Sequence, residues 1–132
     1  MNIAAIFDVD GTIFRDSLLL RHMDKCVDYD VFPSMVQEEV KPYFHAWKNR
    51  ELGYEEYLKH AVRIYTQYLN GKSIDDIQFV AKQVIKKDAK KLYHYTAERI
   101  KWHKEQGHKI VFISGSPNFL VEPLAKELGV DI

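Results

Sequence analysis

The chain has 132 residues, with 46% hydrophobic and 29% charged side chains, and its 19 basic residues balance 19 acidic ones. This composition is typical of a folded globular domain and excludes a disordered chain. The balanced charge argues against a protein whose main role is to bind nucleic acid or a membrane surface. A single cysteine, Cys26, excludes an internal disulfide, and no apolar run approaches the ~20 residues of a membrane-spanning helix. The first residues lack the basic and long apolar regions of a signal peptide, so we expect a cytoplasmic protein.

Two short apolar segments, residues 2–9 and 109–113, differ from the rest of the chain. They are short for helices and do not alternate strictly, so they are predicted to be strands buried on both faces of a parallel sheet. Residues 130–132 are predicted to lead into a third strand.

The residues between the two predicted strands are helical in period, and we expect four or five helices from about position 16 to 103. One apolar stripe at helical spacing covers residues 54–69. Ser73 is a candidate N-cap for the next helix, which has acidic residues in its first turn and lysines in its last turn. Pro42 interrupts an earlier stripe, where we expect a kink or a break. Gly107 is a plausible end for the helix before the second strand.

A last helix is predicted after the second strand. Ser116 and Pro117 are suited to its N-cap and first positions, and Gly129 is suited to the position after its end. Pro123 lies inside this segment, where it removes a backbone hydrogen bond, so the helix is expected to start late or to bend.

Asp8 and Asp10 lie at the end of the first predicted strand, two residues apart. Side chains at i and i+2 lie on the same side of a strand, and ligands of open α/β sheets bind beyond the carboxyl ends of the strands. Two carboxylates this close repel each other unless a cation or a shared proton intervenes, and Mg²⁺ suits an oxygen site that handles phosphate. One carboxylate can then attack phosphorus while the other transfers protons. The alternative is a strand end and a turn, in which Asp is common.

Ser114 and Gly115 follow the second predicted strand and precede a helix. A hydroxyl, backbone N–H groups and a helix N-terminus together form an anion-binding pocket. Alone, this pattern also fits any capped helix after a strand. Because the carboxyl ends of parallel strands meet at one edge of a sheet, we expect Asp8, Asp10, Ser114 and Gly115 to form one site.

The segment Asp8-Val9-Asp10-Gly11-Thr12 resembles the first motif of the haloacid-dehalogenase-like (HAD) phosphatase superfamily, and Ile113-Ser114-Gly115-Ser116 resembles its second motif. The helical residues between them resemble the family's inserted cap, and the spacing is most similar to the phosphoserine-phosphatase-like branch, of the subfamily IB type. The resemblance implies an α/β fold with a Rossmann-like parallel-sheet core, formed by residues 1–15 and 104–132. Residues 16–103 would be a helical-bundle cap.

The resemblance also implies a role for each site residue. Asp8 would be the nucleophile that forms an aspartyl-phosphate, and a Mg²⁺ ligand through its side chain. Asp10 would be the general acid/base, and a Mg²⁺ ligand through its main-chain carbonyl. Ser114 and the N–H of Gly115 would hold the phosphoryl oxygens, and the cap would exclude water and select the leaving group. The implied activity is Mg²⁺-dependent hydrolysis of a phosphomonoester, with a small phosphorylated metabolite as the partner.

Two departures from the family pattern bear on this expectation. The family's third motif, with a Lys, and its fourth, with acidic residues, have no counterpart before Ile132, so we expect the amino-terminal part of a longer phosphatase. Each missing electrostatic group would cost ~10²–10³ in rate, so this form could be inactive. Ser17 stands where phosphoserine phosphatases carry a substrate-sensing Glu, which argues against phosphoserine as the substrate.

Without a strand from beyond Ile132, residues 3–9 would be an exposed apolar edge, and we expect self-association there.

Other interpretations stay open. A truncated chain could bind a phosphorylated ligand or a protein without turnover, and a related enzyme could transfer the phosphoryl group to an acceptor other than water, as in a mutase. Residues 81–109 hold nine basic and three acidic side chains, a pattern that nucleic-acid binding can use but that is more often a solvated helix face. His22 and Cys26 lie four residues apart, a spacing that can bind a soft metal, but no further ligands cluster nearby in the sequence.

Overall fold

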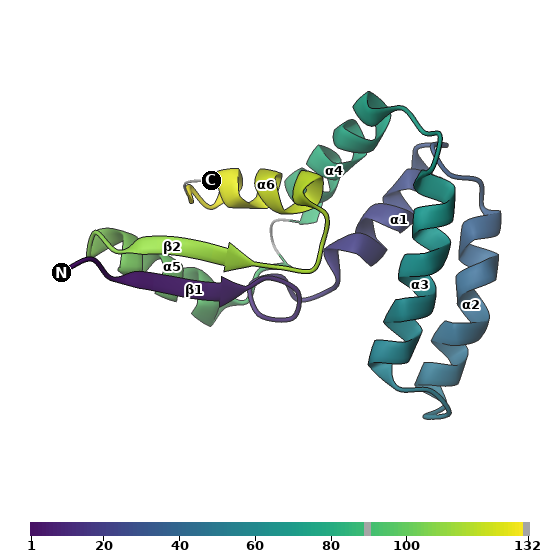
Figure 1. The fold of residues 1–132 in the computed structure, drawn as a ribbon, viewed down its shortest axis with the longest axis horizontal. Helices are drawn as coiled ribbons and strands as arrows, with labels where there is room; N and C mark the ends of the chain where they lie inside the picture. Colours follow the sequence, from purple (N-terminus) through teal and green to yellow (C-terminus); the bar gives the residue numbers. More distant parts are fainter. Residues whose placement is uncertain (89–90, 131–132) are drawn as a thin grey trace. The chain divides into compact units, whose positions relative to one another are not determined.

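The computed structural model describes residues 1–88 and 91–130, and in this part of the chain it has two strands and six helices (Figure 1). In chain order the elements are β1 (Ala4–Asp8), α1 (Leu18–Asp28), α2 (Met35–Lys48), α3 (Tyr54–Leu69), α4 (Ile74–Asp88), α5 (His94–Glu105), β2 (Lys109–Ile113) and α6 (Asn118–Glu127). Five helices therefore lie between the strands, as the sequence predicts, and the predicted α/β class is confirmed.

The chain divides into two compact units. The first comprises Met1–Arg21 and the described part of Ala81–Ile132, and the second comprises His22–Val80. The division falls within α1 and α4. The domain limits given by the resemblance, at positions 15/16 and 103/104, stay predictions.

The first unit is built on a two-stranded parallel sheet, counted over the described residues. Ala4 of β1 is paired with Lys109 of β2, and Asp8 with Ile113. The two arrowheads in Figure 1 point to the same end, where the turn after β1 and the loop after β2 begin. The predicted parallel strands are confirmed, and their register brings the residues that follow each strand to one edge of the sheet.

One face of this sheet is open, so the prediction that both faces are buried is wrong for the described residues. The side chains of Ile6, Val111 and Ile113, which share this face, are 64%, 41% and 59% exposed. The opposite face is covered by α5, where the rings of Phe7 and His103 meet edge to face with centroids 6.0 Å apart. The residues that the structure describes supply apolar cover for one face only.

Two helices run through an internal proline. Pro42 lies inside α2 and Pro123 lies inside α6, so neither a break at Pro42 nor a late start caused by Pro123 occurs. A proline removes one hydrogen bond of the helix. The buried apolar residues of each helix supply more stabilisation than that bond, because tertiary packing dominates helix stability in proteins.

A glycine follows the end of α5 and of α6 by two residues, as predicted. Gly107 has φ +71° and Gly129 has φ +62°, a region that L-residues with a Cβ rarely adopt. Their N–H groups donate to the carbonyl oxygens of Lys104 and Lys126 at 3.0 Å, which satisfies carbonyl groups in the last helical turn.

The core of the second unit contains a buried histidine. His22 Nδ1 lies 2.9 Å from the hydroxyl of Tyr65 in α3, and His22 Nε2 lies 3.0 Å from the carbonyl oxygen of Ile77 in α4. The sulfur of Cys26 lies 3.6 Å from Nδ1. Burial lowers the pKa of His22, so the neutral ring is favoured, with Nε2–H donating to Ile77. Both ring nitrogens are thus occupied inside the unit, and the soft-metal interpretation of His22 and Cys26 finds no support.

The expectations of a third strand and of no membrane-spanning helix can be compared with the residues that the structure describes. The predicted third strand falls on residues 130–132, of which Asp131 and Ile132 lie outside the described residues. Within residues 1–88 and 91–130, no helix has the length and apolar character needed to cross a membrane.

Candidate active site

β1 ends at Asp8, and a tight turn follows it. The carbonyl oxygen of Val9 accepts hydrogen bonds from three N–H groups of this turn at 2.9–3.2 Å, and Gly11 takes φ +76°. The hydroxyl of Thr12 donates to Oδ2 of Asp8 at 3.2 Å. The side chain of Asp8 is otherwise exposed, so its carboxylate faces solvent at the carboxyl end of the strand.

The carboxylate of Asp10 is part-buried and accepts three hydrogen bonds. The N–H of Leu18, the first residue of α1, donates to Oδ1 at 2.7 Å. The hydroxyls of Ser114 and Ser116 donate to Oδ2 at 3.3 and 2.8 Å. These three donors, one of them at the N-terminus of α1, hold the Asp10 side chain in one orientation.

The loop after β2 is held together by its own serines. The N–H of Ser116 donates to Oγ of Ser114 at 3.0 Å. Gly115, between them, is exposed, and a Cβ added there would meet no atom within 4 Å. The predicted N-cap role of Ser116 is wrong, because α6 begins at Asn118 with Pro117 as its N-cap. The Ser116 hydroxyl instead donates to a carboxylate, which is a stronger acceptor than a neutral group.

The structure therefore brings Asp10 and Ser114 into contact across 104 positions of sequence. Asp8 is paired in register with Ile113, the residue before Ser114, so it lies at the same edge of the sheet. Gly115 lies between the two serines that hold Asp10. The catalytic, phosphate-binding and metal-binding roles of these four residues stay predictions.

Thr12 and Ser116 contact the predicted site residues without having been predicted themselves. The sequence could have indicated Ser116, because it comes two positions after Ser114 and side chains at i and i+2 lie on the same side of an extended chain. No such indication exists for Thr12, because its approach to Asp8 depends on the turn at Gly11. Ser17, where the family's substrate-sensing Glu was expected, is buried, and its Oγ lies 3.4 Å from the N–H of Leu20 at the start of α1.

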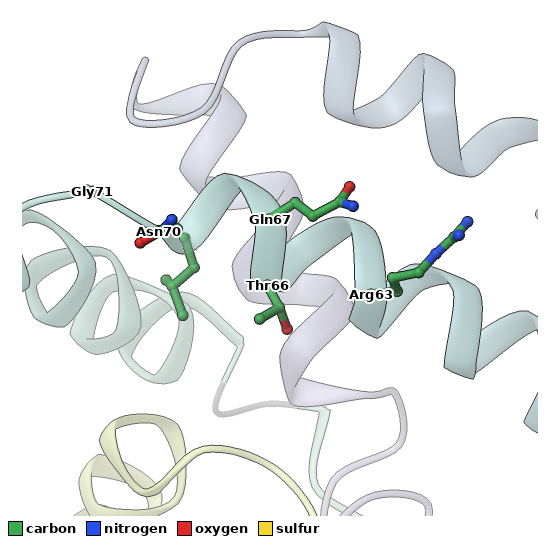
Figure 2. Close-up of a pocket in the computed structure, with 6 residues that line it drawn as sticks. Arg63, Thr66, Gln67, Asn70 and Gly71 are labelled. Carbon is green, nitrogen blue, oxygen red and sulfur yellow. The ribbon is translucent and has the colours of Figure 1, made fainter.

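A separate pocket of about 750 Å³ lies on the second unit, at the C-terminal end of α3 (Figure 2). Its lining consists of Arg63, Thr66, Gln67, Leu69, Asn70 and Gly71. Figure 2 shows Thr66 and Gln67 pointing to different sides of the helix, so these polar groups do not converge on one ligand. No candidate active-site residue lines this pocket.

Comparisons with known proteins agree with the sequence motifs. A phosphoserine phosphohydrolase-like protein from Francisella tularensis subsp. tularensis SCHU S4 is similar in structure, with a TM-score of 0.59 and 17% identity over 99% of this chain and 55% of that one. A protein of unknown function from Bordetella pertussis Tohama I gives a TM-score of 0.70 at 15% identity, over 99% and 59% of the two chains. A phosphoserine phosphatase, solved as a phospho-aspartyl intermediate analogue, gives 0.56 at 20% identity, over 98% and 54%.

These structural likenesses establish the fold. The chain spans 54–59% of the length of these solved structures. A search of curated proteins finds no significant match. The sequence matches the haloacid dehalogenase-like hydrolase family over residues 5–132, almost the whole chain. The chain therefore belongs to the haloacid dehalogenase-like hydrolases.

Proposed function

We propose that the chain supplies the nucleophile, the general acid/base and the phosphoryl-binding loop of a phosphoric monoester hydrolase that acts on a small phosphorylated metabolite. The observation that carries this proposal is the contact between Asp10 and Ser114 at the carboxyl edge of parallel strands. Family membership supports the hydrolase class. The names of two structural neighbours, a phosphoserine phosphatase and a phosphoserine phosphohydrolase-like protein, support a phosphatase-type reaction.

The proposed reaction has two steps. Asp10 enters the first step as the protonated acid: a carboxylate oxygen of Asp8 attacks phosphorus in line, the bond to the leaving oxygen breaks, and that oxygen takes the proton of Asp10. This step leaves an aspartyl-phosphate on Asp8. Asp10 then removes a proton from water, the water oxygen attacks phosphorus, and phosphate leaves while the Asp8 carboxylate is restored. Asp8 suits the first step because its carboxylate is exposed and has one identified hydrogen-bond donor, Thr12.

Ser114 and Gly115 are proposed to bind the phosphoryl oxygens. The Ser114 hydroxyl is anchored by the N–H of Ser116, and the space around Gly115 is open, so an anion can approach this loop closely. The N-terminus of α6, at Asn118, adds a favourable field for an anion.

This edge offers Mg²⁺ the oxygen chemistry that it prefers, through the Asp8 carboxylate and the main chain of Asp10. Mg²⁺ prefers oxygen ligands and is commonly bound by one or two carboxylates together with substrate phosphate and water. No group of three His, Cys, Asp or Glu side chains suited to a metal occurs within residues 1–88 and 91–130. The proposed ligands are those that the family resemblance implies, the Asp8 carboxylate and the Asp10 main-chain carbonyl, and the three donors on the Asp10 carboxylate are consistent with that carboxylate not binding the metal. Bound Mg²⁺ would reduce the negative charge that the phosphoryl group and Asp8 present to each other.

The direct test is phosphate release from an aryl phosphate, with and without Mg²⁺, by the protein at its full length and by the Asp8→Asn variant of that protein. We expect Mg²⁺-dependent release that Asp8→Asn abolishes, while Asp28→Asn, an exposed carboxylate at the end of α1, retains it. Retained turnover in Asp8→Asn would remove Asp8 from the nucleophile role.

Two other outcomes identify the alternatives. Saturable binding of tungstate, a phosphate mimic, without any phosphate release would indicate a binding module. A phosphorylated acceptor in place of free phosphate would indicate phosphoryl transfer of the mutase type.

Self-association through the exposed edge of β1 is also proposed. Its support is that β1 pairs with β2 along one edge only in the described residues, and that Ile6 of β1 is 64% exposed, since an apolar edge strand invites pairing with another chain.

A further inference from the structure

Two hydroxyl groups donate to the same oxygen of Asp10. The Ser116 bond to Oδ2 is 2.8 Å long and the Ser114 bond is 3.3 Å long. The shorter distance is near the ordinary length of an O–H···O bond, and the longer one is beyond it. Ser116 is therefore the stronger of the two donors to Oδ2.

Ser114 cannot hold Asp10 and a phosphoryl oxygen with one proton. A serine hydroxyl has a single O–H donor. Its oxygen also accepts the N–H of Ser116 at 3.0 Å, which fixes that oxygen in place and leaves the proton as its means of contacting an anion. When the Ser114 proton turns to a phosphoryl group, the bond from Ser114 to Asp10 is lost.

We infer that Ser116 is a positioning residue that holds Asp10 and Ser114 while the Ser114 proton turns from Asp10 to the phosphoryl group. The hydroxyl of Ser116 keeps the Asp10 carboxylate in place, and the N–H of Ser116 keeps the Ser114 oxygen in place. The inference rests on the proposed function. With Leu18 N–H on Oδ1 and Ser116 on Oδ2, each oxygen of the Asp10 carboxylate retains a donor after Ser114 has turned away. Asp10 is then held in one orientation while it transfers protons.

The two contacts of Ser116 can be separated by mutation. Ser116→Ala removes the hydroxyl and leaves the main-chain N–H on Ser114. We therefore expect kcat to fall on the order of tenfold, the effect of losing one hydrogen bond to a charged group, while KM changes by less than about twofold. Ser116→Thr retains a hydroxyl and should restore most of kcat. Ser114→Ala removes the phosphoryl-binding hydroxyl itself and should raise KM as well.

The experiment compares these variants in Mg²⁺-dependent phosphate release, with Ser34→Ala as the matched control. Ser34 precedes α2 and makes no side-chain cap hydrogen bond, so its substitution should leave kcat and KM unchanged. Circular dichroism of each variant confirms folding. An unchanged kcat in folded Ser116→Ala, or the same kcat loss in Ser116→Thr as in Ser116→Ala, would overturn the inference.

A second readout does not depend on turnover. The amide of Leu18 reports on the Asp10 carboxylate, and Leu18 is far in sequence from Ser116. We expect Ser116→Ala to shift the Leu18 amide resonance and speed its hydrogen exchange, and Ser116→Thr to restore both. No phosphate release from the unmodified full-length protein would count against the proposed function, whereas an unmoved Leu18 amide would count against Ser116 as the group that holds Asp10.

Discussion

The guanidinium of Arg21 binds the carboxylate of Asp88 at two points, with N–O distances of 3.2–3.3 Å, although the residues are 67 positions apart. Asp88 is only 7% exposed. Lys91 lies 4.0 Å from the same carboxylate and 3.1 Å from the carboxylate of Asp16. A backbone bond from Arg15 N–H to the Lys91 carbonyl, at 2.9 Å, joins the same two segments. The chain on either side of His22–Val80 is therefore tied together within the first unit.

Arg21→Met should lower the free energy of unfolding by about 1–3 kcal/mol, because it removes the two hydrogen bonds that a guanidinium donates to a nearly buried carboxylate. Urea denaturation measures the change. Glu105→Ala is the control: its pair with Lys101 is exposed and 4.0 Å long, so the loss should stay below about 0.5 kcal/mol. Equal effects in the two variants would show that Arg21 contributes no more than a surface charge.

His22 should make the free energy of unfolding fall as the pH drops below 6.5, the ordinary pKa of histidine. Burial lowers its pKa in the folded chain, so below pH 6.5 the unfolded chain takes up a proton that the folded chain does not. The contribution is fully present above that pH and is lost as pH falls toward the lowered pKa. Chemical denaturation at pH 7.5 and 5.0 should therefore show a smaller pH effect in His22→Gln than in the wild type. His94→Gln, at a side chain 84% exposed, should keep the wild-type pH effect.

Arg50 adopts φ +62° just after α2, where its N–H donates to the carbonyl of Trp47 at 3.0 Å. This is the helix-ending position that favours glycine, and an L-residue there is strained by roughly 1 kcal/mol. Arg50→Gly should therefore raise the free energy of unfolding by about 0.5–1 kcal/mol in a thermal or urea denaturation. The same substitution at Lys59, exposed in the middle of α3, should lower it by about 1 kcal/mol. A loss of stability in Arg50→Gly would contradict the strain argument.

Self-association should depend on the exposed edge strand β1. We expect the average mass from light scattering to rise with concentration, and Ile6→Lys to suppress the rise, because a lysine on an apolar edge strand opposes pairing with another chain. Ile74→Lys provides the matched control, since Ile74 is 73% exposed at the start of α4 and does not belong to the sheet. A monomer of constant mass across a wide concentration range would contradict the proposal.

The sequence by itself determined the elements of this protein and the location of its candidate chemistry. The stripe over residues 54–69, the helix after Ser73 and the ends at Gly107 and Gly129 are local patterns of spacing and backbone conformation, and they are present in the structure. Asp8 at the end of β1, Asp10 two residues later and Ser114 after β2 could be identified because polar residues at the ends of apolar strands lie at one edge of a parallel sheet.

The tertiary structure alone decided how these pieces meet. That Ser116 binds Asp10 rather than capping α6, that Arg21 pairs with Asp88, and that His22 is enclosed by Tyr65 and Ile77 all depend on chain segments tens of residues apart. The helices around Pro42 and Pro123 continue because packing outweighs one lost hydrogen bond, and the exposure of Ile6 depends on which neighbours cover the sheet. Local sequence encodes periodicity and backbone preference, whereas burial and long-range hydrogen bonds exist only once distant segments have come together.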